Sequence, residues 1–170
     1  PGDLDMYLYV PSDMPENAPV VVAMHGCNQA GTGNTGMMTL GNENHANTFM
    51  AQTGWTKLAD EHKFYVIFPE GTRRSTTTKG NSFGDATGLK GQSNKHRVNG
   101  DFVCLQWAGF YGHNLERDTG EGKSIIDMID FVKAKYSVND NHIYASGFSA
   151  GAGMATYLAA AYPDVFAGVA

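Results

Sequence analysis

The chain alternates short apolar runs with longer polar segments. The runs are rich in β-branched and aromatic residues and are bounded by Gly, Pro, Asn or Asp, a pattern typical of β-strands. They cover residues 6–10, 19–24, 64–68, 143–145 and 166–170. The first run is expected to be an edge strand. The second is apolar throughout, which indicates a parallel strand buried on both faces.

Apolar residues also recur at helical spacing between these runs. Trp55, Leu58 and Ala59 predict an amphipathic helix over residues 53–62, with Thr53 as its N-cap. Its position between two predicted strands is that of a crossover helix.

A second helix is predicted after residue 118. Residues 118–121 have the character of a capping box, and a turn is expected at 138–141. The apolar face of this helix consists of Ile125, Ile129, Val132 and Tyr136. Strands and helices therefore alternate, which predicts an α/β fold with a mostly parallel sheet, right-handed crossovers and flanking helices.

Composition limits the domain count and the classes of function. A chain of 170 residues with 42% apolar residues can form one domain, residues 1–170, with a sizeable core. A net charge of −5 without a basic patch argues against a nucleic-acid partner, and no apolar run is long enough to span a membrane. His, Asp and Glu show no metal-ligand spacing, so a metal enzyme is not expected.

The sequence at 147–151, Gly-Phe-Ser-Ala-Gly, is a G-x-S-x-G pattern between a predicted strand and a small-residue helix at 150–161. This is the context of a nucleophile elbow, in which a tight turn needs small residues two positions before and after the serine. Ser149 is then the candidate nucleophile, and the amide of Ala150 can donate to an oxyanion. The alternative is an ordinary turn between a strand and a helix. The elbow context narrows the fold to an α/β-hydrolase.

A second candidate element follows the buried strand at 19–24. His25-Gly-Cys-Asn-Gln stands where this fold takes its other oxyanion-hole amide, which would be that of Cys27. For the His25 side chain we expect a structural role in bracing the loop.

An ordered series of motifs resembles one esterase family over nearly the whole chain. The motifs are His25-Gly-Cys-Asn-Gln29, Gly54-Trp-x-x-Leu-Ala-Asp60, Val66-Ile-Phe-Pro-Glu70, Cys104-x-x-Trp107, Arg117-x-x-Gly-Glu121 and Tyr144-x-x-Gly147-x-Ser149-Ala-Gly151. Together they are similar to those of the extracellular poly(3-hydroxybutyrate) depolymerases and the acetylxylan and feruloyl esterases.

The resemblance implies a serine carboxylesterase that acts on a polyester or on acyl-substituted plant polysaccharide. By position, Ser149 matches the nucleophile, and Cys27 and Ala150 match the oxyanion amides. Trp107 matches an aromatic residue that we treat as a candidate substrate contact. The partner is thus a polymeric or small ester, and no cofactor is implied.

The two cysteines are interpreted through the same resemblance, which implies a Cys27–Cys104 disulfide and a secreted protein. The alternative is two buried free thiols in a cytosolic enzyme. The chain shows no signal peptide.

A general base is missing from the expected place. The fold orders its triad as serine, acid and histidine, yet the only acid after Ser149 is Asp164, which we interpret as a residue at a helix end. The histidines all precede Ser149, at positions 25, 45, 62, 96, 113 and 142. We therefore expect this chain to be the N-terminal part of a catalytic domain, with the acid and the histidine on strands beyond residue 170.

Two alternatives remain open at this point. One is a catalytically inactive hydrolase-fold binding protein, and the other is a different hydrolase of the same fold, such as a peptidase or a small-ester hydrolase. The loops at 30–47 and 72–100 are expected to hold much of the substrate preference. The sequence does not indicate an oligomeric state.

Overall fold

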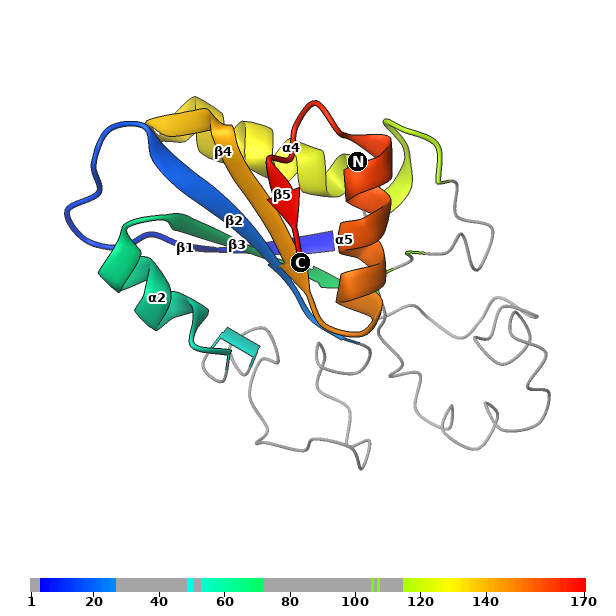
Figure 1. Ribbon diagram of the computed structural model, residues 1–170, viewed down its shortest axis with the longest axis horizontal. Coiled ribbons are helices and arrows are strands. Elements are labelled where there is room, and N and C mark those ends of the chain that lie inside the picture. Colours follow the sequence, from blue (N-terminus) through cyan, green and yellow to red (C-terminus); the bar gives the residue numbers. More distant parts are fainter. Residues whose placement is uncertain (1–3, 27–48, 51–52, 72–104, 106, 108–114) are drawn as a thin grey trace.

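The computed structural model describes residues 4–26, 49–50, 53–71, 105, 107 and 115–170. A twisted five-stranded sheet forms its centre, with strand order β1-β3-β2-β4-β5 (Figure 1). The strands are β1 Leu4–Tyr9, β2 Ala18–Met24, β3 Tyr65–Gly71, β4 Val138–Gly147 and β5 Gly168–Val169. All neighbours are parallel except β1, which runs antiparallel to β3 at one edge.

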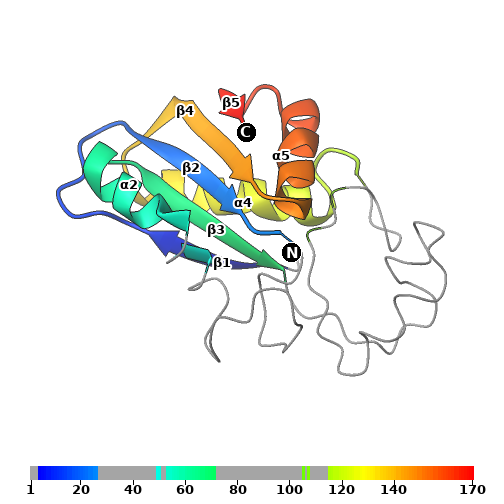
Figure 2. The ribbon, with the colours of Figure 1, turned by 60° about the horizontal axis from the view of Figure 1, so that its bottom comes forward.

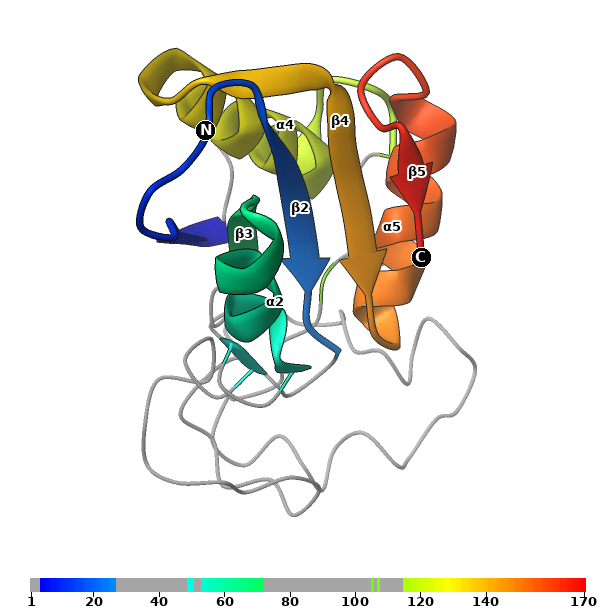
Figure 3. The same cartoon turned by 60° about the vertical axis from the view of Figure 1, so that its left-hand side comes forward.

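Helices cover both faces of this sheet (Figures 2 and 3). They are α2 Trp55–His62, α4 Gly120–Lys135 and α5 Ala150–Ala161. The alternation of side chains along the strands separates two apolar clusters, because successive residues point to opposite faces. Val20 and Val22 of β2 share a cluster with α4 and α5, whereas Ala23 shares one with Ala59 of α2. This is the predicted α/β arrangement.

Strand β3 is longer than the sequence predicts, because it continues through Pro69 to Gly71. Proline has no N–H to donate, so a strand usually ends where one occurs. Beside β2, however, β3 is paired only from Tyr65 to Ile67, and Pro69 lies beyond that ladder opposite Met6 of the edge strand. The missing donor therefore falls where no ladder bond to β2 is needed.

The predicted turn at 138–141 is wrong, since these residues are the first part of β4. The ladder with β2 shifts register here, and Val138 lies opposite Ala18 while Ile143 lies opposite Val20. The amide of Asn141 donates to Oδ1 of Asn139 at 3.0 Å. The turn-forming residues thus produce an irregularity inside the strand rather than its boundary.

Both predicted helix caps are also wrong. Helix α2 has Gly54 as its N-cap, in the left-handed region at φ 72°, and the hydroxyl of Thr53 donates back to the carbonyl of Phe49 at 2.8 Å. Glycine reaches this conformation without a steric penalty, so the chain turns there. At α4 the N-cap is Thr119, and its hydroxyl donates to the carbonyl of Glu116 at 2.7 Å instead of to a helix amide.

The last strand is present but shorter and less buried than predicted. β5 spans only Gly168–Val169, and Val169 is 41% exposed. Among the strands that the structure describes, β5 stands at the end of the order, paired with β4 alone. The helices described in the structure include none long and apolar enough to cross a membrane.

Candidate active site

Ser149 occupies the turn between β4 and α5. Its backbone has φ 55° and ψ −115°, which is strained for a residue with a side chain. The residue is exposed at the end of the strand, while Ala150 directly after it is buried. The strand, turn and helix predicted around the serine are therefore present, with the serine at the exposed point of the turn.

The flanking glycines are required by close backbone contacts. A Cβ on Gly147 would lie 2.2 Å from the carbonyl carbon and oxygen of Gly151. A Cβ on Gly151 would lie 2.3 Å from the carbonyl oxygen of Met24, at the end of β2. The helix can thus start directly against two strand ends only because these two positions have no side chain.

The first amides of α5 are aligned beside Ser149. Ala150 is the first residue of the helix, so its amide has no carbonyl four residues earlier within the helix to bind. Two of the following amides are used locally, since the N–H of Gly151 donates to the carbonyl of Phe148 at 2.9 Å and the N–H of Gly153 donates to that of Ser149 at 3.1 Å. A helix N-terminus is also the positive end of the helix dipole, which favours a developing oxyanion.

The loop after β2 begins next to this turn. His25 is 2% exposed, and its Nδ1 lies 2.7 Å from the carbonyl oxygen of Gly26. Because a carbonyl can only accept, this contact requires the proton on Nδ1. The imidazole also meets Phe49 edge-on, with ring centroids 6.4 Å apart. Such a buried and hydrogen-bonded ring supports the predicted structural role of His25 in bracing the loop. The predicted oxyanion-hole residue Cys27 and its predicted disulfide partner Cys104 lie outside the described residues.

Trp107 lies against the first turn of α5. A Cβ on Gly153 would be only 2.4 Å from Cδ2 of the indole, so the ring is in close contact with the helix backbone. Trp107 remains 37% exposed. Phe148, which the sequence did not single out, is 59% exposed immediately before Ser149. One exposed aromatic side chain therefore directly precedes the serine, and a second lies against the helix that follows it.

The described histidines each have surroundings of their own. His25 binds its own loop, and His62 lies on the exposed surface of α2 beside Glu61. His142 is in β4, five residues before Gly147, which is about 16 Å along an extended strand. His45, His96 and His113 lie outside the residues that the structure describes.

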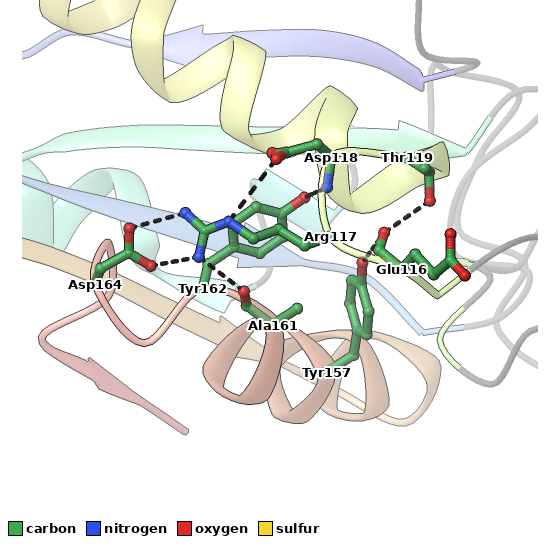
Figure 4. Close-up of polar contacts among 8 residues, drawn as sticks. All are labelled: Glu116, Arg117, Asp118, Thr119, Tyr157, Ala161, Tyr162 and Asp164. Carbon is green, nitrogen blue, oxygen red and sulfur yellow. Dashed lines mark hydrogen bonds and ion pairs between the residues drawn. The ribbon is translucent and has the colours of Figure 1, made fainter.

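Asp164 is placed at the opposite end of α5 from Ser149. Twelve helical residues separate the two ends by about 18 Å. As predicted, Asp164 lies at a helix end, but it is not simply solvated, because Arg117 binds both of its carboxylate oxygens, at 2.5 and 2.8 Å (Figure 4). Hydrogen bonding to Arg117 lowers the pKa of Asp164 to about 2.

Known proteins share both the sequence and the fold. The family model for "Esterase PHB depolymerase" matches residues 92–170. Poly(3-hydroxyalkanoate) depolymerase C of Paucimonas lemoignei is 39% identical over all 170 residues, which cover 100% of this chain and 31% of that protein. Residues 92–170 thus match the esterase PHB depolymerase family, and the chain as a whole is similar to a depolymerase of that kind. The resemblance inferred from the motif series is thereby confirmed.

The chain is also similar to proteins named as feruloyl and acetyl xylan esterases. Feruloyl esterase B of Talaromyces funiculosus is 28% identical over 168 residues, 98% of this chain and 35% of that protein. An acetyl xylan esterase structure from Aspergillus awamori superimposes with a TM-score of 0.62 at 22% identity, covering 98% of this chain and 45% of that one. The fold is that of an α/β-hydrolase. The chain spans about a third of the length of these two curated relatives.

Proposed function

We propose that the protein containing this chain is a serine carboxylesterase with Ser149 as its nucleophile. The observation that carries the proposal is the strained, exposed backbone of Ser149 at the start of α5, held by the close contacts of Gly147 and Gly151. A strained residue needs a reason to persist, and presenting an Oγ above a helix N-terminus is such a reason.

The reaction is acyl transfer in two halves. The Oγ of Ser149 gives up its proton to a base and forms a bond to the ester carbonyl carbon. The amides of Ala150 and Cys27 donate to the oxyanion of the tetrahedral intermediate. Collapse of that intermediate breaks the ester C–O bond, and the alcohol leaves with the proton. Water then attacks the acyl-enzyme and releases the carboxylic acid and Ser149.

The base and its acid are proposed to come from the part of the relatives' length that this chain does not span. Two findings support this: the curated relatives above are about three times longer, and the described histidines have other surroundings, with Nδ1 of His25 bound to the carbonyl of Gly26 and His142 in β4 well before the elbow. A serine without a base is a weak nucleophile, so full activity requires that part of the protein.

The substrate is proposed to be a polyester or an acyl-substituted plant polysaccharide. The names of the relatives support both, since they include a poly(3-hydroxyalkanoate) depolymerase, feruloyl esterases and acetylxylan esterases. The exposed indole of Trp107 beside α5 is a suitable surface for either chain. Secretion and a Cys27–Cys104 disulfide are part of the same proposal.

Hydrolysis by the natural full-length protein tests the proposal. The substrates are p-nitrophenyl acetate and butyrate, poly(3-hydroxybutyrate) film, acetylated xylan and a feruloyl ester. We expect turnover of at least the small esters, and its loss in Ser149→Ala with the thermal midpoint retained. Equal turnover by Ser149→Ala would refute the role of Ser149. Binding to a polymer without any turnover would instead favour an inactive hydrolase-fold binding protein.

A further inference from the structure

Helix α5, which carries Ser149 at its start, has few side chains that could fix its position near the site. Its first four residues are Ala150, Gly151, Ala152 and Gly153, and the contact with β2 is made by backbone atoms. The large buried side chains follow later, at Met154 and Leu158. These small residues let the first turn pack closely against β2 and Trp107, but they provide no large side chain of their own that interlocks with a neighbour.

The C-terminal end of α5 is held by one guanidinium. Nη1 of Arg117 donates to the carbonyl oxygen of Ala161 at 3.0 Å and to Oδ1 of Asp164 at 2.5 Å, while Nη2 donates to Oδ2 at 2.8 Å (Figure 4). The same group lies 4.7 Å above the ring of Tyr162. A bidentate, planar cation at the negative end of a helix fixes both distance and direction.

Residues of the segment around Arg117 also contact the buried side chain of Tyr162. The tyrosine is 0% exposed, and its hydroxyl accepts from the amide of Asp118 at 2.7 Å. Asp118 adopts φ 64°, a strained backbone that turns its amide toward this hydroxyl. The ring is thus held through its face by one residue and through its hydroxyl by the next.

A second tyrosine joins the helix to the same segment. The hydroxyl of Tyr157 donates to the carbonyl of Glu116 at 3.4 Å, and its ring lies so close to Gly122 of α4 that a Cβ there would be 2.6 Å away. Burial raises the pKa of Tyr157 to about 12, so this hydroxyl stays protonated and able to donate. The contacts of residues 116–118 with Tyr157, Ala161, Tyr162 and Asp164 are referred to below as the α5 clamp.

We infer that Arg117 is a positioning residue that sets the axial position of α5, and through it the position of Ser149, by means of the α5 clamp. The inference rests on the proposed function for its catalytic part. A helix transmits a shift at one end to the other, so loss of the clamp displaces Ser149 relative to the loop that starts at His25. A misplacement of about 1 Å can lower a reaction rate by about a hundredfold.

Amide hydrogen exchange tests whether Arg117 holds α5 in place, and this test does not depend on enzymatic activity. In Arg117→Gln we expect the amides of Met154 and Ala155 to exchange faster, relative to wild type, than the amide of Val22 in the central strand. The matched control is Lys133→Gln. It removes an exposed ion pair, in which Nζ of Lys133 lies 2.8 Å from Oδ1 of Asp140, and this pair does not involve α5. Equal acceleration at Val22 and in α5 would mean a loss of general stability only and would overturn the inference.

Inactivation by a fluorophosphonate tests the catalytic part in the natural protein. Serine Oγ displaces fluoride from phosphorus, so the rate reports the reactivity of Ser149. We expect Arg117→Gln to react ten- to a hundredfold more slowly at a temperature where it is fully folded, with Asp164→Asn intermediate and Lys133→Gln unchanged. A wild-type rate in Arg117→Gln would refute the positioning role. If wild type does not react, the proposed function fails, and the exchange experiment alone decides the inference.

Discussion

Replacing Gly151 by alanine tests the close approach on which the elbow depends. The new Cβ would lie 2.3 Å from the carbonyl oxygen of Met24, 2.7 Å from its carbon and 2.8 Å from the carbonyl oxygen of His25, whereas ordinary contact begins at 3.4 Å. These atoms are backbone at the end of β2 and the start of its loop, so no flexible side chain can move aside. The N-terminus of α5 and the strand must separate by about 1 Å in a closely packed interior.

Two free-energy terms oppose each other in this variant. Alanine is favoured over glycine inside a helix by about 1 kcal/mol. Overpacking by one methyl group costs about 1–3 kcal/mol, and more where the neighbours are rigid. Because the neighbours here are backbone, we expect the cost to exceed that range and the net destabilisation to be more than about 2 kcal/mol. The separation also moves Ser149 away from the loop after β2, so fluorophosphonate reactivity should fall by about a hundredfold.

The matched control is Gly168→Ala in β5. It makes the same chemical change, but its Cβ would meet only the Tyr144 ring at 3.5 Å, an ordinary contact. Urea unfolding gives the stability difference, and the inactivation rate gives the reactivity. If Gly151→Ala is as stable and as reactive as Gly168→Ala, the close packing at the elbow does not position the serine.

The remaining predictions concern the packing of α5 and the clamp. Leu158→Ala removes a side chain that is 0% exposed beneath α5 and should cost about 2–5 kcal/mol in urea unfolding; a loss below about 1 kcal/mol would contradict its place in the core. Asp164 has a folded pKa of about 2 against an ordinary 3.8, so its stabilising effect is present above the ordinary value and is lost as pH falls through about 2. The wild-type urea midpoint should therefore fall more steeply than that of Asp164→Asn over this interval, and parallel curves would refute the pairing. Tyr162→Phe removes the acceptor of the Asp118 amide and should cost about 1–3 kcal/mol, whereas no loss would mean that water replaces the hydroxyl.

Local patterns were sufficient for the main elements of this fold. The apolar run before His25 predicts a buried strand, and the spacing from Ile125 to Val132 predicts the inner face of α4, because burial selects side chains at the period of each element. Tyr136, predicted on the same face, is instead the extended C-cap of α4. The small residues around Ser149 similarly predict a tight turn, since only a missing Cβ permits it.

Features that depend on distant neighbours could not be predicted in this way. Whether Pro69 ends a strand depends on which neighbouring strand pairs with it. In the structure Pro69 lies opposite Met6 of β1 and beyond the ladder with β2, and this arrangement cannot be deduced from the local sequence. Arg117 and Asp164 are 47 residues apart and carry no local signal of their pairing. Thr53 has the side chain of a helix cap, but Gly54 after it can take a left-handed conformation and provides the turn instead.

Covalent labelling of Ser149 tests the proposed function most directly. The natural full-length protein is treated with a fluorophosphonate, its intact mass is measured, and the labelled peptide is sequenced by mass spectrometry beside a Ser149→Ala control. The proposal predicts one adduct per chain, located on Ser149 and absent from the variant. An adduct on another residue, or continued ester hydrolysis by a protein that carries no label on Ser149, would contradict it.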